Sequence, residues 1–232
     1  MEFKDPLETG FPPEMFLDTE SGQATGVGPE LCRLMAQDLG VDLNCVDIPW
    51  PEHIDALLAG EVDLTLGTNT PDRALRIDFV PWRLMENRVT GLATRGAEIS
   101  SAELDSPDQT LVCWHGSSIV AVARKHFPQA TVIESTNPPQ AIRSGQASAF
   151  ITDSVTYRLL EILDELSFVM DGGAPLLLSR EFVHFAINPG DTRFMTWLVN
   201  WHDFHDAQGT VGAWCDTYWE SHMADTPTPD RA

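Results

Sequence analysis

The sequence predicts an α/β protein of two Rossmann-like lobes with mixed, mostly parallel sheets, joined by a two-segment hinge. Short apolar strands alternate with amphipathic helices along most of the chain. Residues 56–66 and 141–151 read alike, because each passes from a helix end through a glycine into a short apolar strand. A second β/α set is inserted within the first. We therefore predict one lobe from residues 1–88 and 183–232, a second from 89–182, and a ligand cleft between them.

The first lobe begins with an extended segment. Two prolines exclude a helix from residues 10–16. Residues 29–39 form a predicted helix, because proline stands in the first turn and Gly40 stops the apolar periodicity. The elements that follow are a strand over 42–48, a helix over 51–58 ended by Gly60, and a strand over 62–66.

The second lobe repeats the alternation. Its predicted strands are 88–94, 111–114, 132–133 and 147–151, and its helices are 116–126, 138–144 and one from Asp153-Ser154 to 163. The chain returns through a strand over 182–187 and ends in tryptophan-rich helices over 192–205 and 211–219, which we interpret as core packing. The two predicted crossings between lobes, near residues 86–92 and 178–184, would form the hinge.

Composition excludes several functions. With 35 acidic and 14 basic residues, the formal charge of −21 opposes binding to nucleic acid or to anionic lipid. No window approaches the roughly 20 apolar residues that a membrane span needs. The first residues, 1–5, are not a signal peptide, so we expect either a cytoplasmic protein or a chain that starts near a mature end from which a signal peptide was removed.

The cysteines and histidines suggest no cofactor or metal. Cys32, Cys45, Cys113 and Cys215 lack the spacing of a zinc or thioredoxin motif. Cys32 and Cys45 could pair in an oxidising compartment or remain buried thiols. His202 and His205 share a helix face without a third ligand, so no metal site is expected.

Polar residues follow the two similar strands. The first strand is followed by Gly67, Thr68, Thr70 and Arg73, and the second by Asp153. Ligands of open α/β sheets bind just beyond the carboxyl ends of strands. One lobe would thus offer a cation with hydroxyl groups, and the other a carboxylate. This arrangement suits a small zwitterion such as a free amino acid.

Several motifs together resemble family 3 of the bacterial extracellular solute-binding proteins, which serve amino-acid ABC transporters and have the type II periplasmic-binding-protein fold. The resembling segments are Asp5-Pro6 with Pro12-Pro13 and Phe16; Gly22 with Gly26-Val-Gly-Pro-Glu-Leu31 and Leu39-Gly40; Trp50 with Ile54, Leu57, Gly60 and Val62-Asp63-Leu64; Thr70-Pro-Asp-Arg73 with Asp78-Phe79; Gly116-Ser-Ser118; and Ile142 to Asp153. Each piece is weak, but their combination covers nearly the whole chain.

The resemblance implies roles for individual residues. Arg73 would hold the ligand α-carboxylate through its planar fork, and Asp153 would accept from the α-ammonium. The remaining ligand-binding residues that it implies are Gly67, Thr68, Thr70, Ser117, Ser118, Phe11 and Trp114. It further implies a periplasmic monomer without cofactor that closes on its ligand and delivers it to an ABC transporter permease.

Other interpretations stay open at this point. Arg73 could be a surface arginine beside Asp72, Asp153 could be only a helix N-cap, and Phe11 and Trp114 could be core residues. Cyclohexadienyl dehydratases resemble the same fold, and their pattern places a glutamate where this chain has Thr156, so we expect no enzyme. An accessory or sensor module is the third possibility.

Overall fold

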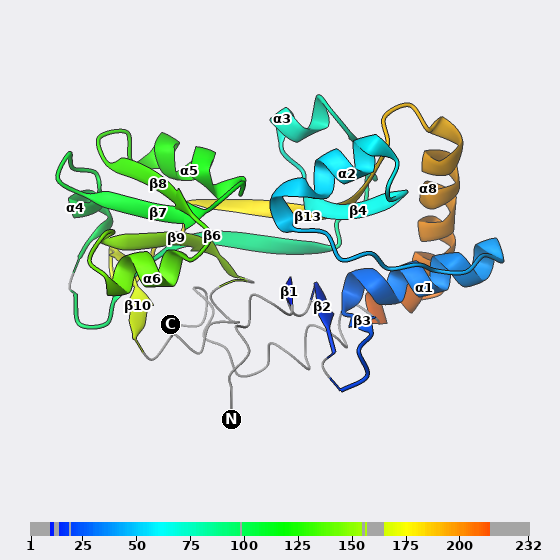
Figure 1. The fold of residues 1–232 in the computed structure, drawn as a ribbon, viewed down its shortest axis with the longest axis horizontal. Coiled ribbons are helices and arrows are strands. Elements are labelled where there is room, and N and C mark those ends of the chain that lie inside the picture. The colour runs from blue at the N-terminus through cyan, green and yellow to red at the C-terminus, as the bar shows by residue number, and fades with distance from the viewer. Residues whose placement is uncertain are drawn as a thin grey trace. The chain divides into compact units, whose positions relative to one another are not determined.

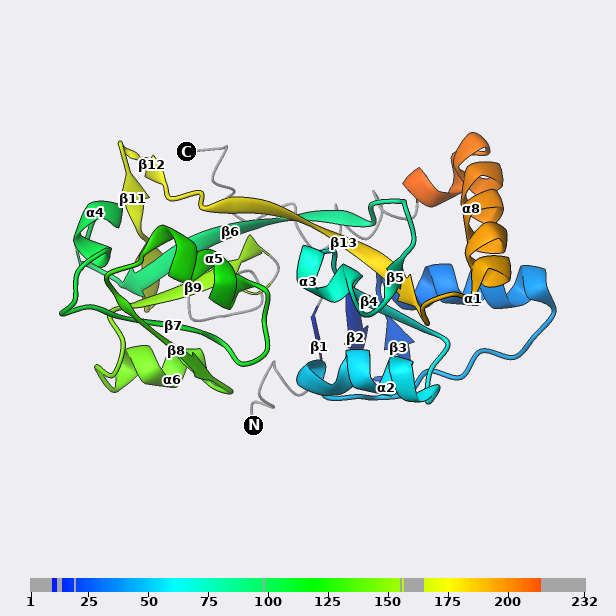
Figure 2. The same ribbon diagram turned by 90° about the horizontal axis from the view of Figure 1, so that it is seen from above.

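The computed structural model describes residues 10–11, 14–18, 20–97, 99–154, 156 and 165–213. These residues divide into two compact units. The first unit takes the residues up to Glu86 and those from Phe182 onward, and the second takes Asn87–Glu181. The chain passes between units within two long strands, β6 (Met85–Thr94) and β13 (Ser179–Ile187), which Figures 1 and 2 label. Among the described helices, none has the length and apolar character to cross a membrane.

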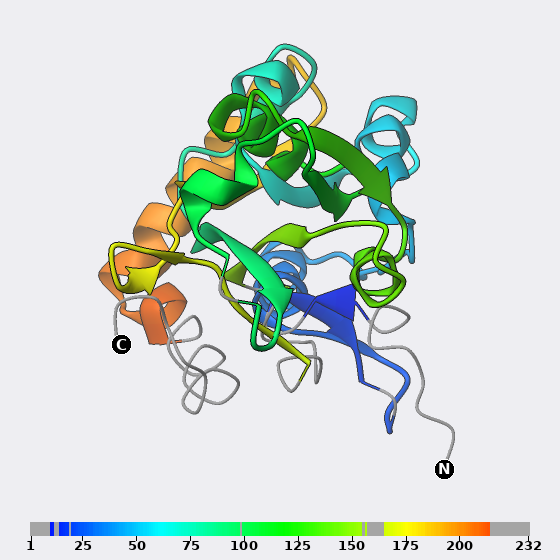
Figure 3. The same cartoon turned by 90° about the vertical axis from the view of Figure 1, so that its left-hand side faces the viewer.

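The first unit contains a small antiparallel sheet and a second group of paired strands. Its elements are β1 (Gly10–Phe11), β2 (Met15–Leu17), β3 (Ala24–Thr25), α1 (Val27–Leu39), the 3-10 helix η2 (Trp50–Glu52), α2 (His53–Ala59), β4 (Leu64–Thr68), α3 (Pro71–Ala74), β5 (Asp78–Phe79) and α8 (Thr192–Ala207). Strands β1, β2 and β3, dark blue in Figure 3, pair in that order, and β13 pairs antiparallel with β4 and β5.

Two glycines end the helices of this unit as predicted. Gly40 after α1 and Gly60 after α2 are left-handed, with φ of 68° and 73°. Their backbone N–H groups bond to the last helical carbonyls, a conformation that glycine adopts without a steric penalty. Helix α2 thereby leads into β4, whose end carries several predicted site residues.

Strand β4 has α1 on one face and α2 on the other. A side chain at Gly28 of α1 would collide with Leu66, so glycine permits the close approach of α1 to β4. On the opposite face, Ile54 and Leu57 of α2 form a core with Ile77 and Ala186. Because neighbouring residues of a strand point to opposite faces, Gly67 turns toward α2.

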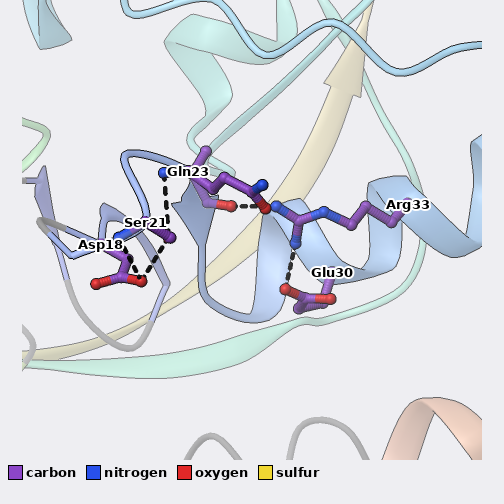
Figure 4. A network of polar contacts seen from close by, with 6 residues as sticks. Asp18, Ser21, Gln23, Glu30 and Arg33 are labelled. Carbon is purple, nitrogen blue, oxygen red and sulfur yellow. Dashed lines mark hydrogen bonds and ion pairs between the residues drawn. The ribbon is translucent and has the colours of Figure 1, made fainter.

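A polar network ties the β2–β3 hairpin to α1 (Figure 4). Arg33 of α1 donates to the Ala24 carbonyl and pairs with Glu30. Within the hairpin, Ser21 donates its hydroxyl to Asp18 at 2.5 Å. These residues line a hollow of about 310 Å³. Since each of these charged groups bonds to a neighbour in the hairpin or in α1, we assign this network to the fold.

Helix α8 docks through aromatic contacts and one carboxylate. Trp201 is 6% exposed, and its ring lies 5.8 Å from that of Trp82. Asp38 accepts from Trp201 Nε1 at 2.8 Å and contacts His205 Nε2 at 2.7 Å. These contacts confirm the predicted packing role for Trp201, whereas most of the predicted helix 211–219 lies outside the described residues.

The second unit has a mixed sheet covered on both faces. With β6, it contains α4 (Ser101–Leu104), β7 (Thr110–Trp114), α5 (Ile119–His126), β8 (Thr131–Ser135), α6 (Pro138–Arg143), β9 (Ala149–Asp153), β10 (Leu166–Phe168), β11 (Met170–Asp171) and β12 (Ala174–Pro175). Its strand order is β6-β9-β7-β8, with β10 on β6. Leu111 and Ile151 pack against α5, and Val112 and Phe150 pack against α6. Figure 1 shows these two helices on opposite sides of the strands.

Two fold predictions need correction. Residues 42–48 form no strand, and Val41 and Val46 beside and within this segment are 57% and 50% exposed. A strand needs a hydrogen-bonding partner, and no described residue supplies one there. The expectation of mostly parallel sheets is also wrong for the described strand pairs, because only the pairs of β7 with β8 and with β9 are parallel. Helical crossovers link β7, β8 and β9, whereas β6 and β13 enter the sheets by other connections.

Candidate ligand-binding residues

The guanidinium of Arg73 lies against the end of β4. Thr70 caps α3 by accepting from the Arg73 backbone N–H at 3.3 Å, and Pro71 occupies the first helical position. This turn directs the half-buried Arg73 back, so that its Nη1 donates to the Thr68 carbonyl at 3.3 Å. The structure therefore brings together Gly67, Thr68, Thr70 and Arg73, as their spacing suggested, and Thr70 has a capping role of its own.

An aromatic pair that the sequence analysis did not select adjoins Arg73. The Arg73 Cζ atom lies 5.6 Å from the ring centroid of Trp50, within the range of a cation–π contact. The imidazole of His53 stacks on the Trp50 ring, with the ring centroids 4.2 Å apart and the ring planes inclined by 20°. Trp50 was part of the family-like motif, so that motif was a usable signal. Nothing in the spacing singled out His53.

His53 is a neutral, buried group beside this arginine. It is 7% exposed, and its Nδ1 bonds to the Trp50 carbonyl. Burial lowers the pKa of His53, and the positive charge of Arg73 acts in the same direction. The Trp50 carbonyl and the carboxylate of Asp55 oppose this lowering. At neutral pH the imidazole is therefore uncharged, and the positive charge at this end of β4 belongs to Arg73.

In the second unit, Trp114 is the last residue of β7, and the loop that follows carries Ser117 and Ser118. Gly116 turns the chain with φ of 71°, and its N–H donates to Glu134 at 3.1 Å. The buried Trp114 Nε1 and Ser117 Oγ atoms have no hydrogen-bond partner among the described residues. The ring of Trp114 is half-buried and lies edge-on to Phe150, at 5.9 Å. Trp114 thus contributes to the core and keeps an unpaired donor near the loop.

Asp153 stands at the same edge of the sheet as this loop. Strands β7 and β9 are parallel neighbours, so their carboxyl ends, at Trp114 and Asp153, coincide. Asp153 Oδ1 accepts from the Thr156 N–H at 2.9 Å, which confirms the predicted N-cap. The rest of the predicted helix to residue 163 lies mostly outside the described residues. Asp153 Oδ1 therefore caps the helical turn that begins at Ser154.

Glu181 is a second acidic residue that the sequence analysis missed. It lies in β13, next to the division between the units, and accepts from the Ser118 hydroxyl at 2.8 Å. No local motif marks it, because the two residues are 63 positions apart.

For Phe11, the structure places its backbone in β1, opposite Met15. The described residues contain no cluster of acidic, histidine or cysteine side chains that could hold a metal ion.

Comparison with known proteins places this geometry in context. The family model "Bacterial extracellular solute-binding proteins, family 3" matches residues 7–221. No match was found among curated proteins. Among solved structures, a putative ABC-transporter binding component from Wolinella succinogenes, complexed with lysine, is 26% identical. The alignment covers 94% of each chain with a TM-score of 0.75.

Two further structures are similar. An ancestral amino acid-binding protein, described as a precursor of cyclohexadienyl dehydratase, is 26% identical over 90% of this chain and 91% of its own, with a TM-score of 0.72. The solute receptor for L-cysteine of Neisseria gonorrhoeae is 21% identical over 95% and 90%, with a TM-score of 0.77. At 21% identity, the similarity to the Neisseria gonorrhoeae receptor concerns the fold alone.

Proposed function

Because the chain belongs to family 3 of the bacterial extracellular solute-binding proteins, we propose that it captures an α-amino acid for an ABC transporter. The observation that carries this proposal is the placement of Arg73. Its guanidinium is half-buried, held at the end of β4 and flanked by Trp50. A planar guanidinium binds a carboxylate through two parallel hydrogen bonds, and partial burial strengthens them.

The second unit would supply the partner for the ligand ammonium group. Asp153 is a half-buried carboxylate at the edge of the sheet where the loop with Ser117 and Ser118 also lies. The two units would act as lobes that close on the ligand about the chain crossings after Glu86 and Glu181. Closure excludes water, which strengthens both charge-assisted contacts and favours the bound state.

Trp50 would contact the ligand side chain in this proposal. Its indole is half-buried, and its ring face attracts apolar groups as well as cations. The lysine in the Wolinella succinogenes protein fits such a surface. A family protein of this kind works in the periplasm and hands its ligand to a permease, and we propose the same for this chain.

A dehydratase activity is the competing proposal, since one similar structure is a precursor of such an enzyme. The resemblance places a catalytic glutamate at position 156. Thr156 stands there, 3% exposed, and a hydroxyl group cannot serve as a tuned carboxylic acid. This residue favours ligand capture over dehydration.

A thermal-shift screen against the twenty L-amino acids, with prephenate as the alternative ligand, tests the proposal. A ligand at about 100 times its Kd stabilises the folded protein by roughly 2.7 kcal/mol, which raises Tm measurably. We expect one amino acid, or a few related ones, to do so. If prephenate is the ligand that raises Tm, or no amino acid does so, the proposed function is wrong.

A further inference from the structure

His53 and Arg73 converge on one point above the end of β4. A methyl group built on Gly67 would lie 3.5 Å from His53 Nε2 and 3.8 Å from Arg73 Nη1. These residues come from α2 and α3, and glycine places no side chain between them. A ligand oxygen that reached this point would contact both nitrogen atoms.

The structure determines which imidazole nitrogen titrates. A carbonyl oxygen only accepts hydrogen bonds, so the contact with the Trp50 carbonyl places the proton of neutral His53 on Nδ1. Nε2 then carries the lone pair on the side of Gly67 and Arg73. Protonation converts it from an acceptor into a positively charged donor. The stacked Trp50 ring holds the imidazole in this orientation.

The charged groups around His53 come from several elements. Arg73 of α3 opposes protonation, and Asp55 on α2 favours it weakly, because Asp55 is exposed and paired with Arg76. From β13, His184 lies opposite Gly67, and its Nδ1 contacts the Val80 carbonyl at 2.8 Å. A negative charge placed beside His53 Nε2 would therefore favour protonation of His53 and offset the opposing charge of Arg73.

We propose that His53 is a second carboxylate-binding group, which takes up a proton on Nε2 when the ligand carboxylate binds to Arg73. This inference rests on the proposed function, because it requires a ligand carboxylate at Arg73. The proton comes from solvent and returns to it when the ligand leaves. The bound carboxylate favours imidazolium, so linkage requires the affinity to rise as the pH falls.

Isothermal titration calorimetry at pH 7.5 and 5.5 tests this coupling, with the amino acid that gives the largest thermal shift as the probe. We expect Kd to fall by roughly tenfold at the lower pH, since one coupled proton permits at most about tenfold per pH unit. His53→Asn retains an amide for the Trp50 carbonyl but cannot take up a proton, so its Kd should be nearly independent of pH. Titration in buffers of different ionisation enthalpy should show proton uptake by the wild type only.

His202→Asn is the matched control. His202 also lies 4.2 Å from a tryptophan ring, that of Trp82, but it belongs to α8. This variant should keep the wild-type pH response. The inference is wrong if His53→Asn keeps that response, or if His202→Asn removes it.

Nitrogen-15 NMR of the wild-type histidines gives a test that needs no variant to fold. At pH 6.5, adding the amino acid should shift the His53 Nε2 signal toward the protonated form. An unchanged signal at saturating ligand would overturn the inference. If an amino acid binds without a pH response, the inference about His53 is wrong while the proposed function stands. If none of the twenty amino acids binds, the proposed function is wrong as well.

Discussion

Replacing Arg73 by alanine separates the binding role of this residue from a structural one. Its Nη1 atom donates a long hydrogen bond, 3.3 Å, to the Thr68 carbonyl, and its Cζ atom lies 5.6 Å from the centroid of the Trp50 ring. Contacts of this kind are individually weak, so their loss at a half-buried side chain should lower the free energy of unfolding by about 1 kcal/mol. Binding should suffer more, because the ligand carboxylate would lose the guanidinium that pairs with it through two hydrogen bonds.

Loss of charge-assisted hydrogen bonds to a desolvated carboxylate costs about 2 kcal/mol, so Kd for the amino acid should rise about 30-fold in Arg73→Ala. Arg73→Lys keeps the charge without the planar fork, and we expect an intermediate loss of about tenfold. Arg76→Ala is the control, since Arg76 pairs on the surface with Asp55, and their side chains are 52% and 72% exposed. Calorimetry provides Kd and chemical denaturation provides stability. Unchanged affinity in Arg73→Ala, or an equal loss in Arg76→Ala, would refute the assignment.

Three further predictions concern other residues. Asp153→Asn should change the free energy of unfolding by no more than about 0.5 kcal/mol, because asparagine also caps helices. The variant should raise Kd for the amino acid at least tenfold, because the charge is lost, and an equal Kd by calorimetry would contradict this. Hydrogen bonds from His205 and Trp201 lower the pKa of Asp38. The stability that the Asp38 carboxylate contributes is therefore present above the unfolded pKa and is lost as the pH falls below about 4. The Tm difference between wild type and Asp38→Asn should shrink in that range, and a constant difference would contradict the prediction. Desolvation raises the pKa of the half-buried Cys32 and of the buried Cys113 to about 12. Peptide mapping after brief alkylation at pH 8 should therefore find the exposed Cys45 labelled and these two unlabelled in native protein, and equal labelling would contradict the raised pKa values.

Local sequence signals predicted most helices because their boundaries depend on nearby residues. Helix α1 follows its apolar periodicity to Gly40, and α8 begins where Asp191 accepts from the Phe194 N–H. Strand β4 was placed two residues early, since the apolar run 62–66 does not show where pairing with β13 begins. Small elements such as β5 and β10–β12 escaped prediction, because two or three residues carry no readable period.

Side chains near each other in the chain were predicted better than those brought together by packing. Thr70 and Arg73 lie within one turn, so their relation could be derived from the Thr-Pro-Asp-Arg motif. The contact between Trp50 and Arg73 joins η2 to α3 across a helix and a strand. The bond between Ser118 and Glu181 spans 63 residues. Such pairs depend on how strands and helices pack, which a single sequence does not display.

By itself, the sequence determined the alternating α/β pattern, the glycine helix ends and the motifs that mark the family, since these depend on local backbone preferences and on residue identity. Only the tertiary structure decided the antiparallel placement of β13 beside β4 and the failure of residues 42–48 to form a strand. It also decided the convergence of His53 and Arg73 over Gly67. The physical reason is that strand pairing and desolvation are properties of neighbours in space, and a buried imidazole acquires its protonation state from the groups packed around it.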